Sequence, residues 1–386
     1  MFHGRLCLIA LWAAYPLLAQ LELDPESEQG RKAVVAFDSF WNDPQAGKLA
    51  CTITHFNPAL DYGLRIWTGF QVAISAAEFD GKPDRSSAVV FRVIPSEGPA
   101  KPKYLWLPFE VPGKYPEGAD LRKLELRMGG GFYVGQGKYS VEWLMADGKG
   151  RRCKAAWKLT ANFKAVSPTV PPGTVQALGN EIWPGFPALA PGTKASHATI
   201  FLHAAPVWPR RVVTKLSPWD RQILLSSLNS LLRDANFTSA CVVVFDLERR
   251  NVIYREAVFD RRSMRRLIRQ LAAVDLSTID MATLKNGPSP KDFLEEMLRT
   301  EVKDPTQSDA FVFVGPTWRA GPKLPPIDPA LREALPKTWF LAFTPPAYPS
   351  DGDSVTSLVK SAKGKVIPIY RPSDLADGIR SLNARQ

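Results

Sequence analysis

The sequence contains few of the residues on which most active sites depend. Its 386 residues include only four histidines and four cysteines. There is no Cys-x-x-Cys pair and no His/Cys cluster, so structural zinc is not expected. The Gly-x-Ser-x-Gly turn that exposes the nucleophile of α/β hydrolases is also absent. These absences argue against zinc binding and against serine-hydrolase chemistry.

Long apolar runs are absent except near the start of the chain. There, Arg5 precedes the apolar stretch 6–18, which is too short to span a bilayer comfortably. We predict that residues 1–19 form a secretory signal, cleaved after Ala19. The mature protein is then expected in the periplasm or outside the cell, with no transmembrane span. The alternative is an uncleaved N-terminal anchor.

Charge and cysteine usage fit an exported protein. The formal net charge of +11 could favour anionic partners, such as nucleic acid, lipid headgroups or an acidic polymer or glycan, although the excess could also be spread over the surface. An exported address argues against nucleic acid. In an oxidising compartment Cys51 and Cys153 are candidates for a disulfide, whereas Cys241, at the start of an apolar run, is expected to be a buried thiol.

The first half of the chain has the pattern of an antiparallel β-sandwich. Residues 31–162 contain short runs rich in β-branched and aromatic residues, separated by turn signals. The run Val34–Phe40 is expected to be one of these strands. The clearest hairpin spans 139–153, where Asp147-Gly148 is expected to supply a turn with positive φ. This hairpin resembles the last strands of immunoglobulin-like sandwiches in exported bacterial proteins.

The second half predicts a doubly wound, mostly parallel sheet with helices on both faces. Residues 163–197 are rich in proline and are expected to be a linker. From 198 to 383, apolar strand-like runs alternate with helical patterns, and serines at 217, 289 and 373 are expected as N-caps. The strands 240–246 and 252–259 are close enough in sequence to form an antiparallel hairpin.

The order of these elements resembles a von Willebrand factor A-type domain. In that family a divalent cation is held by an Asp-x-Ser-x-Ser motif after the first strand, by a later Thr and by a further Asp. Here His203, Ala205 and Val207 occupy the motif positions, Ser289 lies near the Thr position, and Gly315-Pro316 replaces the last acidic loop. A hard cation needs anionic oxygen ligands, so we predict no metal and no other cofactor.

Several residues remain as candidates for binding. His203 ends the first strand of this domain, where function concentrates in parallel sheets, and a hydrolase that uses His203 is the least favoured function. Trp208 and Trp318 are expected near the same edge and could contact a partner. Arg262, Arg265 and Arg266, together with arginines 249, 250 and 255, could form an anion-binding patch, although local Asp and Glu could neutralise them.

These features together predict a non-catalytic protein. We expect an exported protein that makes protein–protein contacts or serves as a scaffold in a bacterial envelope, through a metal-free A-type domain. The alternative is a carbohydrate- or polymer-binding protein that uses the β-sandwich, because aromatic side chains in its strands could stack on sugars. Core packing is the competing explanation for those aromatics, which are Trp67, Phe70, Trp106, Phe109, Trp143 and Trp157.

Overall fold

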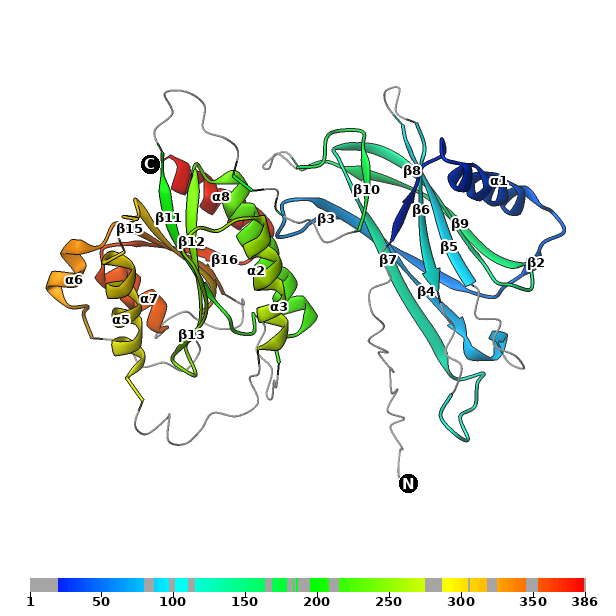
Figure 1. Cartoon of the computed structure of the whole chain (residues 1–386). Helices are drawn as coiled ribbons and strands as arrows, with labels where there is room; N and C mark the ends of the chain where they lie inside the picture. Colours follow the sequence, from blue (N-terminus) through cyan, green and yellow to red (C-terminus); the bar gives the residue numbers. More distant parts are fainter. Residues whose placement is uncertain are drawn as a thin grey trace. The chain divides into compact units, whose positions relative to one another are not determined.

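The computed structural model describes thirteen stretches of the chain. These are residues 20–79, 87–96, 101–109, 115–163, 169–178, 183, 185–186, 195–207, 215–274, 287–304, 306–317, 325–344 and 353–384. The chain divides into two compact units, which we call the β unit and the α/β unit (Figure 1). The β unit comprises Met1–Ala59, Ile66–Asn162 and Pro168–Gly179, and the α/β unit comprises Leu60–Arg65, Phe163–Ser167 and Asn180–Gln386. The expected combination of antiparallel sheets with a mixed parallel sheet and helices is confirmed.

The β unit contains a six-stranded and a four-stranded sheet. The first has the order β1-β6-β5-β8-β9-β2 and the second β10-β7-β4-β3. The strands are β1 Leu21–Leu23, β2 Gly47–Lys48, β3 Thr52–Leu60, β4 Ile66–Ser75, β5 Ser87–Pro95, β6 Lys103–Phe109, β7 Glu125–Val134, β8 Gly137–Ala146, β9 Arg151–Ala161 and β10 Val175–Ala177.

The two sheets of the β unit pack face to face through aromatic side chains. Phe70 of β4 contacts Phe91 of β5 and Trp143 of β8, with ring centroids 5.6 and 5.3 Å apart. Phe91 also contacts Phe132 of β7, and all four rings are fully buried. These rings are core side chains, because each shields apolar area on both sheets from water. A disulfide joins Cys51, which directly precedes β3, to Cys153 of β9, with the Cα atoms 6.2 Å apart.

The expectation of a strand at Val34–Phe40 is wrong, because this segment lies in helix α1, Glu28–Asn42. The Ser27 side chain accepts a hydrogen bond from Gly30 N and caps the helix. Val34, Phe37 and Trp41 share the helical spacing i, i+3, i+7 and pack toward Tyr104 and Leu144 of the six-stranded sheet. The helical spacing of the apolar residues, rather than the β-branched composition, therefore determines the secondary structure of this segment.

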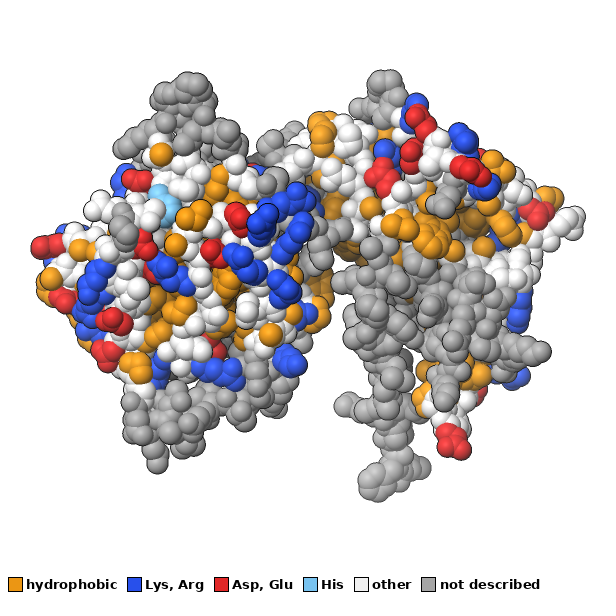
Figure 2. Space-filling view, viewed as in Figure 1, with side chains coloured by type: hydrophobic (Ala, Val, Ile, Leu, Met, Phe, Trp, Pro, Cys, Tyr) orange, Lys and Arg blue, Asp and Glu red, His pale blue; other side chains and the backbone are white. Residues whose placement is uncertain are grey.

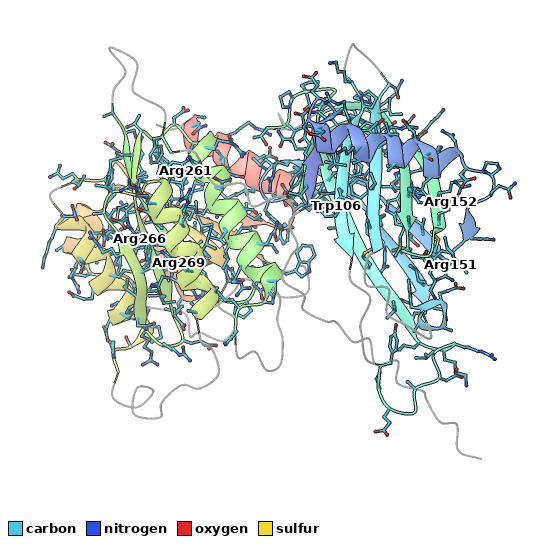
Figure 3. All side chains as sticks on the ribbon, turned by 45° about the vertical axis from the view of Figure 1, so that its right-hand side comes forward. Trp106, Arg151, Arg152, Arg261, Arg266 and Arg269 are labelled. Carbon is cyan, nitrogen blue, oxygen red and sulfur yellow. A yellow bond between two sulfur atoms is a disulfide. The ribbon has the colours of Figure 1, made fainter. Side chains whose placement is uncertain are left out.

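Arginines hold two parts of the β unit in place. Arg92 of β5 lies over the Phe37 ring, 5.1 Å from its centroid, and forms ion pairs with Asp38 of α1 and Glu142 of β8. At the turn between β8 and β9, the Arg151 guanidinium (Figure 3) hydrogen-bonds to Asp147 and Glu78. The residue with positive φ in this turn is Gly150, at 73°, so the expectation for Asp147-Gly148 is wrong.

The α/β unit is built on a six-stranded sheet with the order β13-β12-β11-β14-β15-β16. Only the pairing of β13 with β12 is antiparallel, which confirms the expected hairpin. The strands are β11 His197–His203, β12 Ser239–Asp246, β13 Asn251–Glu256, β14 Ala310–Pro316, β15 Lys337–Phe343 and β16 Lys365–Ile369. The described helices are α2 Pro218–Asp234, α3 Arg261–Ala273, α5 Pro290–Val302, α6 Pro329–Ala334, α7 Ser354–Ser361 and α8 Pro372–Asn383.

Helices cover both faces of this sheet (Figure 1). α2, α3 and α8 pack on one face against aliphatic side chains such as Ile200 and Val312. α5, α6 and α7 pack on the other face against an aromatic layer that includes Phe201, Phe311 and Phe340. Alternate residues of the central strands point to opposite faces and are buried on both, which explains their continuous apolar runs.

Helix capping in the α/β unit follows the sequence at two of three expected positions. Ser217 and Ser289 each begin a helix with a capping box, which Asp220 and Asp292 complete. The expected cap at Ser373 is wrong. Arg371 is the N-cap residue of α8, and the Asp374 carboxylate accepts hydrogen bonds from the backbone N–H groups of Tyr370 and Arg371. Among the described residues, no helix is both long and apolar enough to cross a membrane.

The segment expected to be a linker is partly structured. Residues 168–179 belong to the β unit, and their strand β10 pairs with β7. Trp183 is almost fully buried, and its ring stacks on Phe259 of the α/β unit, with centroids 5.8 Å apart. The expected signal segment 1–19 lies outside the described residues.

Candidate functional site

The carboxyl edge of the parallel sheet places His203 inside the protein. The residue is only 1% exposed, and its ring stacks on Phe245 with centroids 5.0 Å apart. Its Nδ1 lies 2.9 Å from the Pro316 carbonyl oxygen, which can only accept, so Nδ1 carries a proton. Nε2 is buried and has no hydrogen-bond partner among the described residues. Burial lowers the pKa of His203, and the carboxylates of Asp353 and Asp246 partly oppose that shift.

The carboxylates near His203 are engaged in local structure. Asp246 Oδ1 accepts hydrogen bonds from the backbone N–H groups of Glu248 and Arg249, at 2.8 and 3.2 Å, and so caps the turn after β12. Asp353 caps α7, because its Oδ2 accepts from Thr356 N at 2.6 Å. Asp246 therefore caps a loop and Asp353 caps a helix, so both carboxylates order the backbone around His203.

The residues at this edge do not fit a hard cation. His203 is buried with Nδ1 bonded to backbone, and Val207 is buried and apolar. Gly315 has φ +145°, and a Cβ added there would lie 2.8 Å from His203 Cβ. The backbone of Gly315 therefore lies close to His203, at the position where a cation site would need an acidic loop. Within the described stretches, no group of three or more His, Cys, Asp or Glu side chains could hold a metal ion.

Two hollows on the described surface lie elsewhere. One of about 460 Å³ is lined by side chains that include Tyr370, Arg371 and Asp374, and another of about 390 Å³ by Lys337, Lys363 and Lys365 among others. Neither is lined by His203. The tryptophans expected beside this edge, Trp208 and Trp318, lie outside the described residues.

The arginines of α3 form an exposed basic face. Figure 2 shows Lys and Arg side chains gathered over α2 and α3, and Figure 3 labels three of the arginines along α3. Met264, Leu267 and Leu271 of this helix are buried, as the sequence predicts. All five arginines are exposed, and we call them the α3 arginine face: Arg261, Arg262, Arg265, Arg266 and Arg269.

Most of this face has no acidic partner in the part of the chain that the structure describes. Arg266 forms an ion pair with Glu256. The other four arginines form no ion pair with any described residue. Asp260, the nearest other carboxylate in sequence, caps α3, and hydrogen bonds from the Ser263 backbone and hydroxyl lower its pKa. Among the described residues, the possibility that local Asp and Glu neutralise the patch therefore holds for Arg266 alone.

The larger patch expected from the sequence is divided between the two faces of the sheet. Arg255 of β13 forms ion pairs with Glu301 of α5, at 2.7 Å, and with Asp304, at 2.6 Å. α5 packs on the face of the sheet opposite to α3. Arg250, in the turn before β13, donates a hydrogen bond to the Pro288 carbonyl oxygen. Strand alternation was the missed signal, because adjacent residues 255 and 256 must point to opposite faces.

The β unit carries one aromatic surface that sequence reasoning did not separate from the core. Phe70 and Trp143 are fully buried, Trp67, Trp106 and Trp157 are half-buried, and the side chain of Phe109 lies outside the described part. Trp67 lies against Gly69 of its own strand, β4, and against Gly131 of the neighbouring strand, β7. A Cβ added at Gly131 would be 2.6 Å from Trp67 Nε1, and one added at Gly69 would be 2.9 Å from Trp67 Cζ2.

These glycines allow the indole to lie close to the outer side of the four-stranded sheet. Phe56 of β3 stacks beside it, with ring centroids 5.7 Å apart, and is 36% exposed. Together they form an aromatic surface.

No model of a known protein family and no curated protein sequence matches this chain.

Proposed function

We propose that the protein is an exported, non-catalytic binding or scaffolding protein of a bacterial envelope. In this proposal it makes its contacts through a metal-free A-type domain that follows an immunoglobulin-like sandwich. The observation that carries the proposal is the α3 arginine face, where four exposed arginines have no ion pair within the described residues. The element order of the α/β unit and its single antiparallel strand, β13, support the A-type assignment.

The surroundings of His203 support contact rather than catalysis. A general acid or base must come within hydrogen-bond reach of its substrate. His203 is buried, and the neighbouring Asp246 and Asp353 hold backbone N–H groups. The exposed arginines, in contrast, can bind carboxylates without any rearrangement of the core.

Reversing the charge of this face is expected to weaken binding to an acidic polymer. Arg262, Arg265 and Arg269 are replaced together by Glu in the full chain, and affinity for immobilised polyglutamate is measured at several salt concentrations. We expect a loss of about tenfold or more at low salt, because three attractive contacts become repulsive. Salt should shrink the difference by screening exposed charges.

The matched control changes net charge by the same amount in the β unit. Arg122, Lys149 and Lys158 are exposed there and are replaced by Glu. If the control loses as much affinity as the α3 variant, net charge rather than this face accounts for binding, and the proposal fails. Cross-linking and co-purification of the wild-type and α3-variant chains from the native envelope then test whether a partner protein depends on the same face.

A carbohydrate-binding function is a second candidate, favoured by the aromatic surface of Trp67 and Phe56. Aromatic faces stack on the apolar faces of sugar rings, and the half-buried Trp67 with the stacked Phe56 offers such faces on the outer side of the sheet. The competing explanation is that Trp67 covers the glycines and stabilises the sheet. Replacing Trp67 by Ala is expected to reduce binding on a glycan array by about tenfold. The control is Trp106→Ala, on the other sheet; no glycan binding, or equal binding by both variants, counts against this candidate.

A further inference from the structure

The α3 arginine face has the periodicity of a helix ridge. Arg261, Arg265 and Arg269 follow each other at i, i+4 and i+8, and Arg262 and Arg266 form a second row beside them. With a rise of about 1.5 Å per residue, successive arginines in a row are about 6 Å apart along the helix axis. The first row therefore extends over roughly 12 Å. Figure 3 labels Arg261 and Arg269 at its two ends.

Like charges at this spacing are unfavourable for α3 alone. Residues at i and i+4 are neighbours on a helix surface, so arginines in one row repel each other. Within the described residues, only Arg266 receives a carboxylate partner, Glu256, which also accepts a hydrogen bond from the Tyr254 hydroxyl. A partner that brings carboxylates to the first row would remove this repulsion.

The helix is also held so that only its charged side can meet a partner. Leu267 and Leu271 are at most 1% exposed, and the Asp260 cap fixes the first turn. The apolar side of α3 is therefore committed to the core and cannot insert into a lipid bilayer, as membrane-surface helices do. This favours a partner that matches the arginines in charge and spacing.

We infer, on the basis of the proposed function, that this face binds an acidic α-helix whose carboxylates recur at every fourth residue. Two helices can align their i±4 ridges when their axes cross at about −50°. Each carboxylate of the partner's row then meets one guanidinium of the arginine row. The guanidinium group binds a carboxylate with two parallel hydrogen bonds, so the affinity depends on correct spacing as well as on charge.

Two synthetic helical peptides of identical composition test the spacing. One carries Glu at i, i+4 and i+8, in one row, and the other carries Glu at i, i+5 and i+10, which spreads the carboxylates around the helix. Both are checked for equal helicity by circular dichroism and titrated into the full chain. We expect the in-row peptide to bind about tenfold more tightly, and Arg265→Glu to abolish that preference. The control variant is Lys158→Glu, in the β unit.

The outcomes separate this inference from the proposed function. Equal affinity of the two peptides, or no binding of either, overturns the helix assignment. The proposed function fails instead if charge reversal of the α3 arginine face costs no more polyglutamate affinity than the matched control in the β unit. Tighter binding of polyphosphate, or of vesicles rich in anionic lipid, than of the in-row peptide also overturns the assignment. Retention of the in-row preference by Arg265→Glu places the contact elsewhere and overturns it as well.

Discussion

Removal of the disulfide between Cys51 and Cys153 is expected to lower the free energy of unfolding of the β unit by about 2–5 kcal/mol. The bond joins residues 102 positions apart, and closing so long a loop removes much of the conformational freedom of the unfolded chain. It also ties the start of β3, in the four-stranded sheet, to β9, in the six-stranded sheet. Its loss should loosen the β unit and leave the α/β unit unchanged.

Urea unfolding of the full chain, followed by hydrogen exchange of peptides from each unit, measures this effect. The variant is Cys51→Ser with Cys153→Ala, because Cys153 is buried and a hydroxyl there would lack a partner. Reductant should shift wild type by the same amount and leave the variant unchanged. Cys241→Ala is the control, since this buried free thiol lies in the α/β unit. An unchanged midpoint for β8 and β9 peptides would contradict the prediction.

The α/β unit could be predicted from sequence largely because its local signals agree with each other. Apolar runs such as Phe311–Val314 are buried on both sides, and the motifs at Ser217 and Ser289 mark helix starts without ambiguity. The β unit was less predictable at Val34–Phe40, where aromatic and β-branched residues suit both a strand and a packed helix. Only the spacing of Val34, Phe37 and Trp41 separates the two.

The candidate site, the α3 arginine face, was predictable only in part. The exposed side of α3 follows from its own periodicity, so its arginines could be placed from sequence. Whether those arginines have partners depends on long-range contacts. Glu256 reaches Arg266, whereas Glu301, on the other face of the sheet, reaches Arg255. The depth of His203 is equally non-local, because it depends on the close approach of Gly315 and Pro316 from another strand.

Acid is expected to destabilise the α/β unit through His203. Burial lowers the pKa of this residue in the folded state, so below about pH 6.5, the unperturbed value, the unfolded chain binds more protons than the folded chain. The contribution of His203 to the free energy of unfolding is therefore fully present above that pH. It declines as the pH falls, by up to about 1.4 kcal/mol per pH unit, until His203 itself is protonated in the folded protein. Asp353 and Asp246 favour the charged imidazole and limit the range of this decline.

The slope of stability against pH, rather than its absolute value, identifies His203 as the cause. His203→Asn keeps a donor for the Pro316 carbonyl oxygen but cannot titrate, so its free energy of unfolding should vary less between pH 7 and pH 5 than that of wild type. Urea unfolding at each pH, followed through α/β-unit peptides, provides the comparison. Parallel curves for wild type and His203→Asn would mean that the folded protein accepts a proton at this site without loss of stability. The burial of Nε2, which has no partner within the described stretches, argues against that outcome.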